Sequence, residues 1–111
     1  MKLFKFLIIM VTTLLLLYSC AGKRYSSEFD FANNLAKNGL WKEAYIRWQK
    51  ILDSGKESAA LYNNIAIALE KMGKPEEAEK AYQKALKLSP NNSKIKSNYD
   101  RLKKFLEKSE E

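Results

Sequence analysis

The sequence predicts an all-α fold, built as a short solenoid of two helical hairpins and a C-terminal capping helix. The chain holds only four Gly and two Pro in 111 residues, too few for a fold of strands and tight turns. Apolar residues follow the i, i+3, i+4, i+7 spacing of one helix face. The chain also matches itself when it is shifted by 34 residues, and a repeat of this length is typical of stacked helical hairpins. The residues that coincide include Ala32 with Ala66, Leu35 with Leu69, Gly39 with Gly73, Ala44 with Ala78 and Leu52 with Leu86.

The first segment of the chain differs from the rest. Lys2 and Lys5 precede an apolar run over residues 6–18, in which only Thr12 and Thr13 are clearly polar. This run is shorter than the roughly 20 apolar residues that span a bilayer, but its length suits the core of a signal peptide. The sequence therefore predicts a signal peptide over residues 1–19.

The end of this segment resembles the lipobox of bacterial lipoproteins. Leu17, Tyr18 and Ser19 precede the single Cys of the chain, Cys20. Tyr18 departs from the small or β-branched residue that is usual there. The resemblance implies cleavage before Cys20, addition of a diacylglycerol to its sulfur and of a fatty acid such as palmitate to its amine, and a lipidated tether over residues 20–26. Two alternatives stay open: an uncleaved signal anchor, and a cleaved signal that leaves a free Cys.

The resemblance to lipoproteins also carries an expected location. Ala21 stands where an Asp would favour retention in the inner membrane. The expectation is a protein anchored by lipid to the bacterial outer membrane, on its periplasmic side. Lys23 and Arg24 lie in the tether, directly after the lipidated Cys, and could contact anionic headgroups.

The two hairpins and the capping helix are expected to form one domain over residues 27–108. Ser27 followed by Asp30 predicts a capped start of the first helix. In the second copy, Gly73 ends one helix and Pro75 begins the next, with Glu76 and Glu77 in its first turn. The expected helices of the hairpins cover residues 27–38, 41–53, 58–72 and 75–88.

The second copy, about residues 59–92, is similar to the tetratricopeptide repeat. The pattern of large, small and Pro positions is carried by Tyr62, Ile65, Ala66, Leu69, Gly73, Ala78, Tyr82, Ala85 and Pro90. The first copy, about residues 25–58, matches less closely, because Glu28, Ile51 and Lys56 depart from the pattern. The resemblance implies a non-enzymatic protein–protein interaction adaptor, in which the first helix of each hairpin lines a concave face.

A capping helix is expected over about residues 93–108, with Asn92 and Ser93 at its start. Its apolar stripe is Ile95, Tyr99, Leu102 and Leu106, with Phe105 beside it. Its other faces are basic and carry Lys94, Lys96, Arg101, Lys103, Lys104 and Lys108. An amphipathic helix of this kind covers the end of a solenoid.

Helical spacing also separates core from surface. The aromatic residues Trp48, Tyr62 and Tyr82 fall at core positions, and Ala78 is expected at the closest approach of the second hairpin. Trp41 stands where the second copy has Pro75, so it is expected to be partly exposed and is a plausible contact residue.

The composition excludes several classes of function. The chain has no His, which is the commonest general base and metal ligand, and a single Cys cannot form a thiolate cage. It has no phosphate-binding glycine loop. The sequence therefore predicts no enzyme, no cofactor and no metal. The net charge is +7, but export of the protein argues against nucleic acid as a partner.

The resemblance assigns the partner-binding residues to the concave face. These are Asn33, Asn63, Asn64, Ile67, Lys71, Lys94 and Asn98, within a face that also shows Phe29, Asp30, Ala36, Lys37, Ala60 and Glu70. Asn33, Asn64 and Lys94 fall on three of the five positions of the family's carboxylate clamp, while Phe29 and Asn98 replace the other two. The expected ligand is a peptide or protein partner, with the clamp incomplete.

Two other interpretations stay open. The basic C-terminal helix could bind an envelope polymer or anionic lipid through Lys94, Lys96, Arg101 and Lys103. Two repeats are also fewer than the roughly three usually needed for independent stability. A homo-oligomer or a partner that completes the solenoid is therefore an expectation as well.

Overall fold

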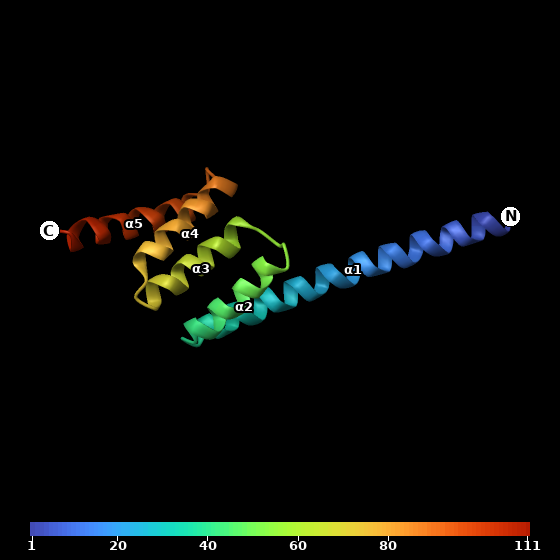
Figure 1. The fold of residues 1–111 in the computed structure, drawn as a ribbon, viewed down its shortest axis with the longest axis horizontal. Coiled ribbons are helices and arrows are strands. Elements are labelled where there is room, and N and C mark those ends of the chain that lie inside the picture. The colour runs from blue at the N-terminus through green and yellow to red at the C-terminus, as the bar shows by residue number, and fades with distance from the viewer.

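The computed structural model describes residues 1–18 and 27–111 with their side chains. Its helices are α1 (Lys2–Lys37), α2 (Trp41–Asp53), α3 (Ala59–Lys71), α4 (Pro75–Leu88) and α5 (Ser93–Ser109). The described residues contain no strand, so the all-α prediction is confirmed. The molecule measures 77 × 29 × 20 Å, with α2 to α5 gathered around the C-terminal end of α1 and the two termini at opposite ends (Figure 1).

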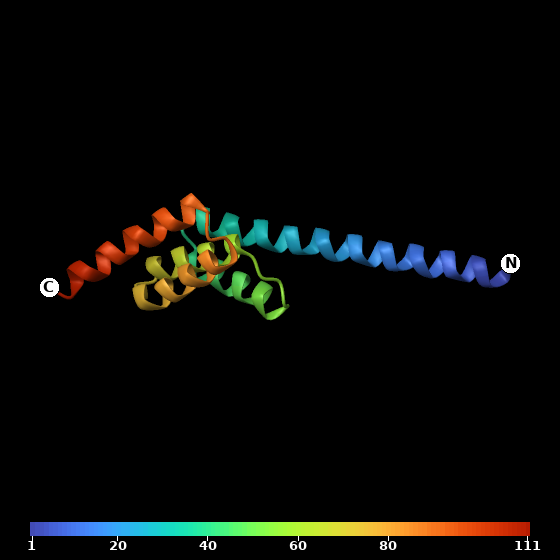
Figure 2. The ribbon, with the colours of Figure 1, turned by 90° about the horizontal axis from the view of Figure 1, so that it is seen from above.

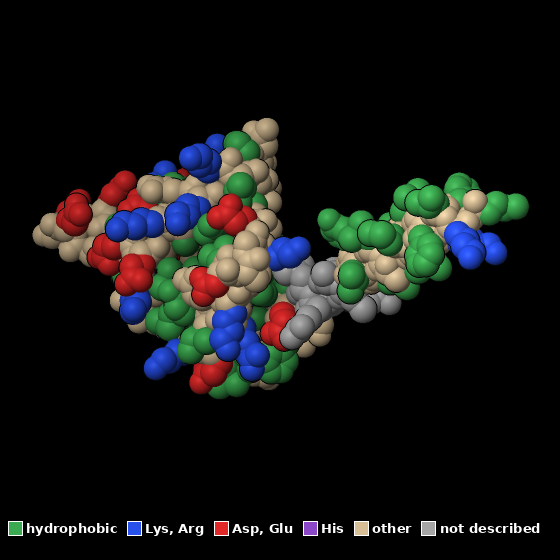
Figure 3. Space-filling view, turned by 45° about the vertical axis from the view of Figure 1, so that its right-hand side comes forward, with side chains coloured by type: hydrophobic (Ala, Val, Ile, Leu, Met, Phe, Trp, Pro, Cys, Tyr) green, Lys and Arg blue, Asp and Glu red, His purple; other side chains and the backbone are tan. Residues whose placement is uncertain are grey.

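The N-terminal part of α1 projects from this body as an apolar arm. Its large side chains, from Leu3 to Tyr18, are exposed (Figure 3). None of the helices, over the residues described, is both long enough and apolar enough to cross a membrane. The helix start that the sequence predicts at Ser27 is wrong, because Ser27 lies inside α1 and Met1 is its N-cap. The arm is rich in Leu, Ile, Met and Phe and has no Pro, so nothing in the described arm ends the helix.

The two hairpins turn at equivalent glycines. Gly39 and Gly73 have φ values of +79° and +73°, a left-handed conformation that favours glycine. The same backbone bond closes both turns: the amide of Leu40 donates to Leu35 over 3.0 Å, and the amide of Lys74 donates to Leu69 over 2.9 Å. The prediction that Gly73 ends its helix is therefore confirmed.

Small residues bring the helices of each hairpin together. Ala32, Ala44, Ala66, Ala78 and Ala85 are fully buried. Trp48, Tyr82 and Leu61 are the largest fully buried side chains, and Tyr62 is buried as well. The predictions that Trp48, Tyr62 and Tyr82 belong to the core, and that Ala78 is buried, are confirmed.

Helix α3 lies at the centre of the body and packs against both α2 and α4. Its buried residues come from almost all sides of the helix: Leu61, Tyr62, Asn63, Ile65, Ala66, Ala68 and Leu69. In Figure 2, α1 and α5 lie along one side of the body and α2 and α4 along the other. This arrangement leaves α1, α3 and α5 to form one continuous face.

Helix α5 covers the C-terminal edge of the second hairpin. The side chain of Asn92 accepts a hydrogen bond from the amide of Ile95 over 3.1 Å, which caps the helix as predicted. Ile95 and Leu102 are buried against the core. The Tyr99 hydroxyl donates to Glu79 and accepts from Gln83 of α4, each over 3.0 Å. The predicted capping role of this helix is confirmed.

Candidate partner-binding face

The face formed by α1, α3 and α5 contains an open hollow of about 480 Å³. Ile67, Glu70 and Lys71 line it from α3, and Asn98 and Arg101 line it from α5. We call it the α3–α5 hollow. It combines one apolar side chain, one carboxylate, one amide and two cations within a single depression.

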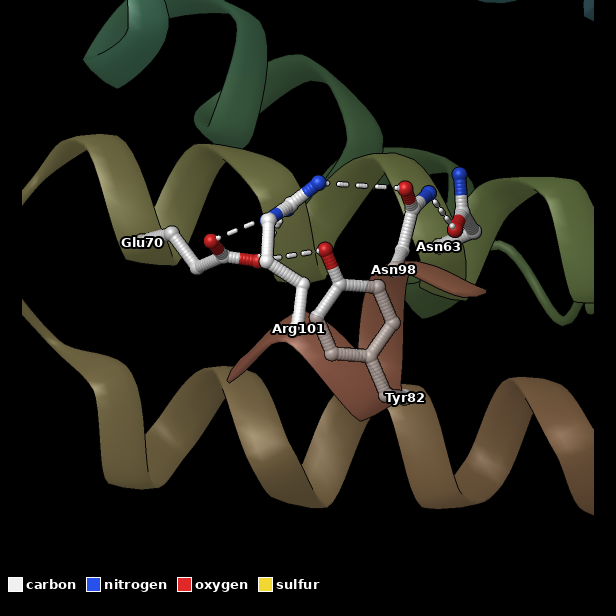
Figure 4. A network of polar contacts seen from close by, with 5 residues as sticks. All are labelled: Asn63, Glu70, Tyr82, Asn98 and Arg101. Atoms are coloured by element: carbon white, nitrogen blue, oxygen red, sulfur yellow. Dashed lines mark hydrogen bonds and ion pairs between the residues drawn. The ribbon is translucent and has the colours of Figure 1, made fainter. Parts of the chain in front are cut away.

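An ion pair forms the centre of the hollow. Arg101 donates from Nη2 to both carboxylate oxygens of Glu70 at 3.1 Å (Figure 4). The Tyr82 hydroxyl, which comes from α4 beneath, donates to the same carboxylate at 2.5 Å. These donors fix the orientation of Glu70. The Arg101 guanidinium stays at the surface, since 59% of the Arg101 side chain is exposed.

The polar core beneath the hollow shifts the ionisation of Tyr82. Burial raises the pKa of the Tyr82 hydroxyl above its usual value, and the hydrogen bond to Glu70 raises it further. Tyr82 therefore stays protonated and remains a donor throughout the physiological range. For Arg101, burial alone would lower the pKa, but the hydrogen bond and charge of Glu70 outweigh it and raise the pKa.

Two pairs of asparagines tie the three helices of the face together. Asn64 of α3 donates to Asn33 of α1 over 3.0 Å, and Asn98 of α5 donates to Asn63 of α3 over 3.0 Å. Arg101 also donates from Nη1 to Asn98 over 3.3 Å. Much of the hydrogen-bonding capacity of these amides is thus used within the chain.

The structure sorts the predicted partner-binding residues into four groups. Ile67, Lys71 and Asn98 line the α3–α5 hollow. Asn33 and Asn64 form a half-buried pair on the α1 side, whereas Asn63 is only 5% exposed and positions Asn98 from below. Lys94 is exposed and is not among the residues that line the hollow.

Sequence reasoning missed the role of Arg101. It placed this residue on the outer basic face of the capping helix, but the structure places it in the hollow beside Glu70. Arg101 lies one helical turn before the position that repeats Glu70 after 34 residues, which is Lys104. A basic residue one turn before Lys104 could have indicated a partner for Glu70. Arg101 does not stand out in this way, because the helix is basic on several faces.

Lys71 also contacts an aromatic side chain. Its amine lies 5.7 Å from the centroid of the Trp41 ring, a cation–π distance. Trp41, the first residue of α2, is half-buried, as predicted, and packs against the core. The amine of Lys71 stays exposed between this ring and the hollow.

The basic surface of α5 is partly neutralised within the chain. Lys103 lies 3.1 Å from Asp100, and this hydrogen bond raises the pKa of Lys103. Arg101 is paired with Glu70. Lys94 and Lys96 are the other two of the four cations proposed for polymer binding. Both are exposed, and neither forms an ion pair with Asp100 or Glu70.

Two remaining predictions concern metal binding and lipidation. Within residues 1–18 and 27–111, no group of His, Cys, Asp and Glu side chains is arranged to hold a metal ion. Cys20, the predicted lipidation site, lies outside the described residues, as do Ala21, Lys23 and Arg24.

Comparison with known families adds one finding. Residues 59–92 match the model of the tetratricopeptide repeat, over the span that the sequence indicates for the second copy. The chain therefore contains a tetratricopeptide repeat. Such repeats generally mediate protein–protein interaction, and proteins built from them are typically non-enzymatic adaptors. No curated protein matches the chain.

Proposed function

We propose that this tetratricopeptide-repeat protein is a lipid-anchored adaptor on the periplasmic side of the bacterial outer membrane, and that it binds a peptide or protein partner through the face of α1, α3 and α5. The observation that carries the proposal is the α3–α5 hollow, where Ile67, Lys71 and Arg101 lie within reach of one extended peptide. The family match of residues 59–92 supports the same assignment.

The chemistry of the hollow suits a peptide with acidic side chains. Lys71 and Arg101 are exposed cations, while Glu70 already has two donors that hold it in place. A peptide carboxylate can pair with Lys71 without disturbing the Glu70–Arg101 pair. Each neutral hydrogen bond contributes about 0.5–1.5 kcal/mol and a charge-assisted one about 1.5–3 kcal/mol.

The anchoring part of the proposal is supported by the arm and by the lone Cys. The apolar side chains of residues 3–18 are exposed and make no part of the core, whose first member is Ala32. Cleavage before Cys20 would remove this apolar segment. A lipidated Cys20 with two or three acyl chains would then hold the domain on the membrane, because one chain alone binds only weakly.

The partner-binding proposal is tested by photo-cross-linking in cells. A cross-linking amino acid at Lys71 should give discrete adducts with a partner protein. The matched control places it at Lys87, an exposed lysine of α4 outside the hollow. Adducts that form equally at both positions, or none at Lys71, would contradict the proposal.

The anchor is tested separately by the change Cys20→Ser. The variant should accumulate as an uncut precursor and should lose incorporation of labelled palmitate, while Ser19→Ala should keep both. A Cys20→Ser chain that is still cleaved and still labelled would refute lipidation, whatever the cross-linking experiment shows.

Binding to an anionic envelope polymer or lipid through α5 is the alternative function. It predicts a steep loss of binding as ionic strength rises. It also predicts loss of binding in the double variant Lys94→Ala and Lys96→Ala, with no effect of Lys71→Ala. Adaptor binding at the hollow predicts the reverse response to these two sets of changes.

A further inference from the structure

Two hollows of the body are lined by equivalent positions of the two repeats. One lies between the hairpins, and its second-repeat side consists of Tyr62, Ile65, Leu69, Glu77, Lys80, Ala81 and Lys84. The other lies on the outer side of the first hairpin and consists of Phe31, Leu35, Glu43, Ile46, Arg47 and Lys50. Each residue of the second set precedes its counterpart in the first set by 34 residues. We call the second set the open stacking face.

The second-repeat surface between the hairpins is covered by helix α2. Ile65, Leu69 and Ala81 are 2%, 4% and 7% exposed, and Tyr45, Gln49 and Leu52 of α2 line the same hollow from the other side. On the open stacking face, Phe31, the counterpart of Ile65, is 47% exposed. Ile46 is 45% exposed, and its counterpart Lys80 is exposed as well. The same kind of surface that is covered inside the molecule is therefore left open at its outer edge.

The opposite edge of the solenoid is covered. Tyr99 of α5 bonds to Glu79 and Gln83, which are the second-repeat counterparts of Tyr45 and Gln49. The edge that would receive an open stacking face in a head-to-tail stack is thus occupied by α5 of the same chain. Two copies can still cover each other if their open faces meet across a two-fold axis, an arrangement in which both use the same surface.

The charges of α2 favour one direction of pairing. Glu43 and Lys50 are both exposed, and they lie at equal distances along α2 from the midpoint between Ile46 and Arg47. An antiparallel pair of α2 helices centred there places Glu43 against Lys50 of the partner subunit at both ends. A parallel pair would place like charges together, which costs free energy.

Arg47 adds no unmatched charge to this surface. Its guanidinium lies 3.6 Å from Glu28 and 5.0 Å from the centroid of the Phe31 ring. This leaves Glu43 and Lys50 as the charges of the face that need a partner across it. We propose that two copies of this chain form a two-fold dimer through their open stacking faces, with the α2 helices antiparallel and Ile46 near the axis.

The dimer is tested with the full chain in detergent, by sedimentation equilibrium over a range of protein concentrations. The parent chain should sediment as a dimer. Ile46→Lys should raise the dimer dissociation constant at least tenfold. Its fold should be kept, because Lys80 occupies the equivalent position of the second repeat. Circular dichroism of the variant checks this point.

A charge exchange tests the antiparallel direction. Glu43→Lys and Lys50→Glu should each raise the dissociation constant about tenfold, since each places like charges together at both ends of the interface. The double variant should return it to within about threefold of the parent value. Glu43 and Lys50 are two helical turns apart on one helix, so this rescue cannot come from a pair within one subunit.

Cysteine cross-linking identifies the occupant of the face. Under oxidation, Ile46→Cys should give a covalent dimer of this chain, and the matched variant Lys80→Cys should give no more than the parent, which carries only Cys20. A monomeric parent chain, a dimer unaffected by Ile46→Lys, or a failure of the double exchange to rescue would each overturn the proposal. Cross-linking of Ile46→Cys only to another protein would do so too.

Discussion

At the scale of single residues, the buried Tyr82 hydroxyl links core packing to the α3–α5 hollow. Burial and the bond to Glu70 raise its pKa, so the folded chain keeps this proton when an exposed Tyr has lost it. The unfolded state releases the proton near pH 10, and the folded state does so only at higher pH. Unfolding therefore releases a proton in this window, and stability should fall as pH rises above about 10.

Tyr82→Phe tests this linkage. The variant keeps the ring but has no hydroxyl, so its free energy of unfolding should fall less steeply with pH above about 10 than that of the parent. Urea unfolding at a series of alkaline pH values measures both slopes. Equal slopes would mean that Tyr82 ionises in the folded chain as it does in water.

Ala78 shows how closely the second hairpin is packed, since it is fully buried between helices joined by a short turn. Ala78→Leu should lower the free energy of unfolding by about 1–3 kcal/mol, because the larger side chain has no space. Ala60→Leu is the matched control, because Ala60 is exposed in α3 and the change there should stay within about 0.5 kcal/mol. A small effect at Ala78, equal to that at Ala60, would argue against tight packing.

At the scale of the helices, the periodic segments were well predicted and one boundary was not. The expected and observed bounds of α2 and α4 coincide, and those of α3 differ by one residue at each end. Gly73 and Pro75 explain the accuracy in the second hairpin, and Asn92 explains the correct start of α5, since each ends or begins a helix by a local effect. The start of α1 was missed because Ser27 and Asp30 form a capping pattern that the preceding helical arm overrides.

The start of α5 offers a local test. Asn92→Ala removes the bond to the Ile95 amide and should lower the free energy of unfolding by about 0.5–2 kcal/mol. The neighbouring Asn91 is exposed and is not the cap residue, so Asn91→Ala should change it by less than about 0.5 kcal/mol. Thermal unfolding followed by circular dichroism compares the two. Equal losses would show that the cap contributes nothing specific.

At the scale of the whole molecule, the sequence placed polar side chains on the first helices of the hairpins and on the capping helix, but it did not predict how these side chains pair. Helical spacing placed Asn63 and Asn64 on α3 together, yet the two point to different neighbours, α5 and α1. The Glu70–Arg101 pair depends on the angle between α3 and α5, which no local pattern encodes. Residue spacing within a helix is local information, whereas pairing between helices is not.

The central position of α3 has a consequence for the exchange of backbone hydrogens with solvent. This helix packs on α2 and α4, and its asparagine side chains bond to α1 and α5, so it contacts every other helix of the described body. Its amides between Ile65 and Leu69 can then exchange only when the whole fold opens, at a rate set by global stability. Those near Phe105, at the exposed end of α5, can exchange by fraying. In deuterated water, mass spectrometry should therefore show α3 labelling last and the end of α5 first, with the slow phase of α3 accelerated by Ala78→Leu in proportion to its loss of stability.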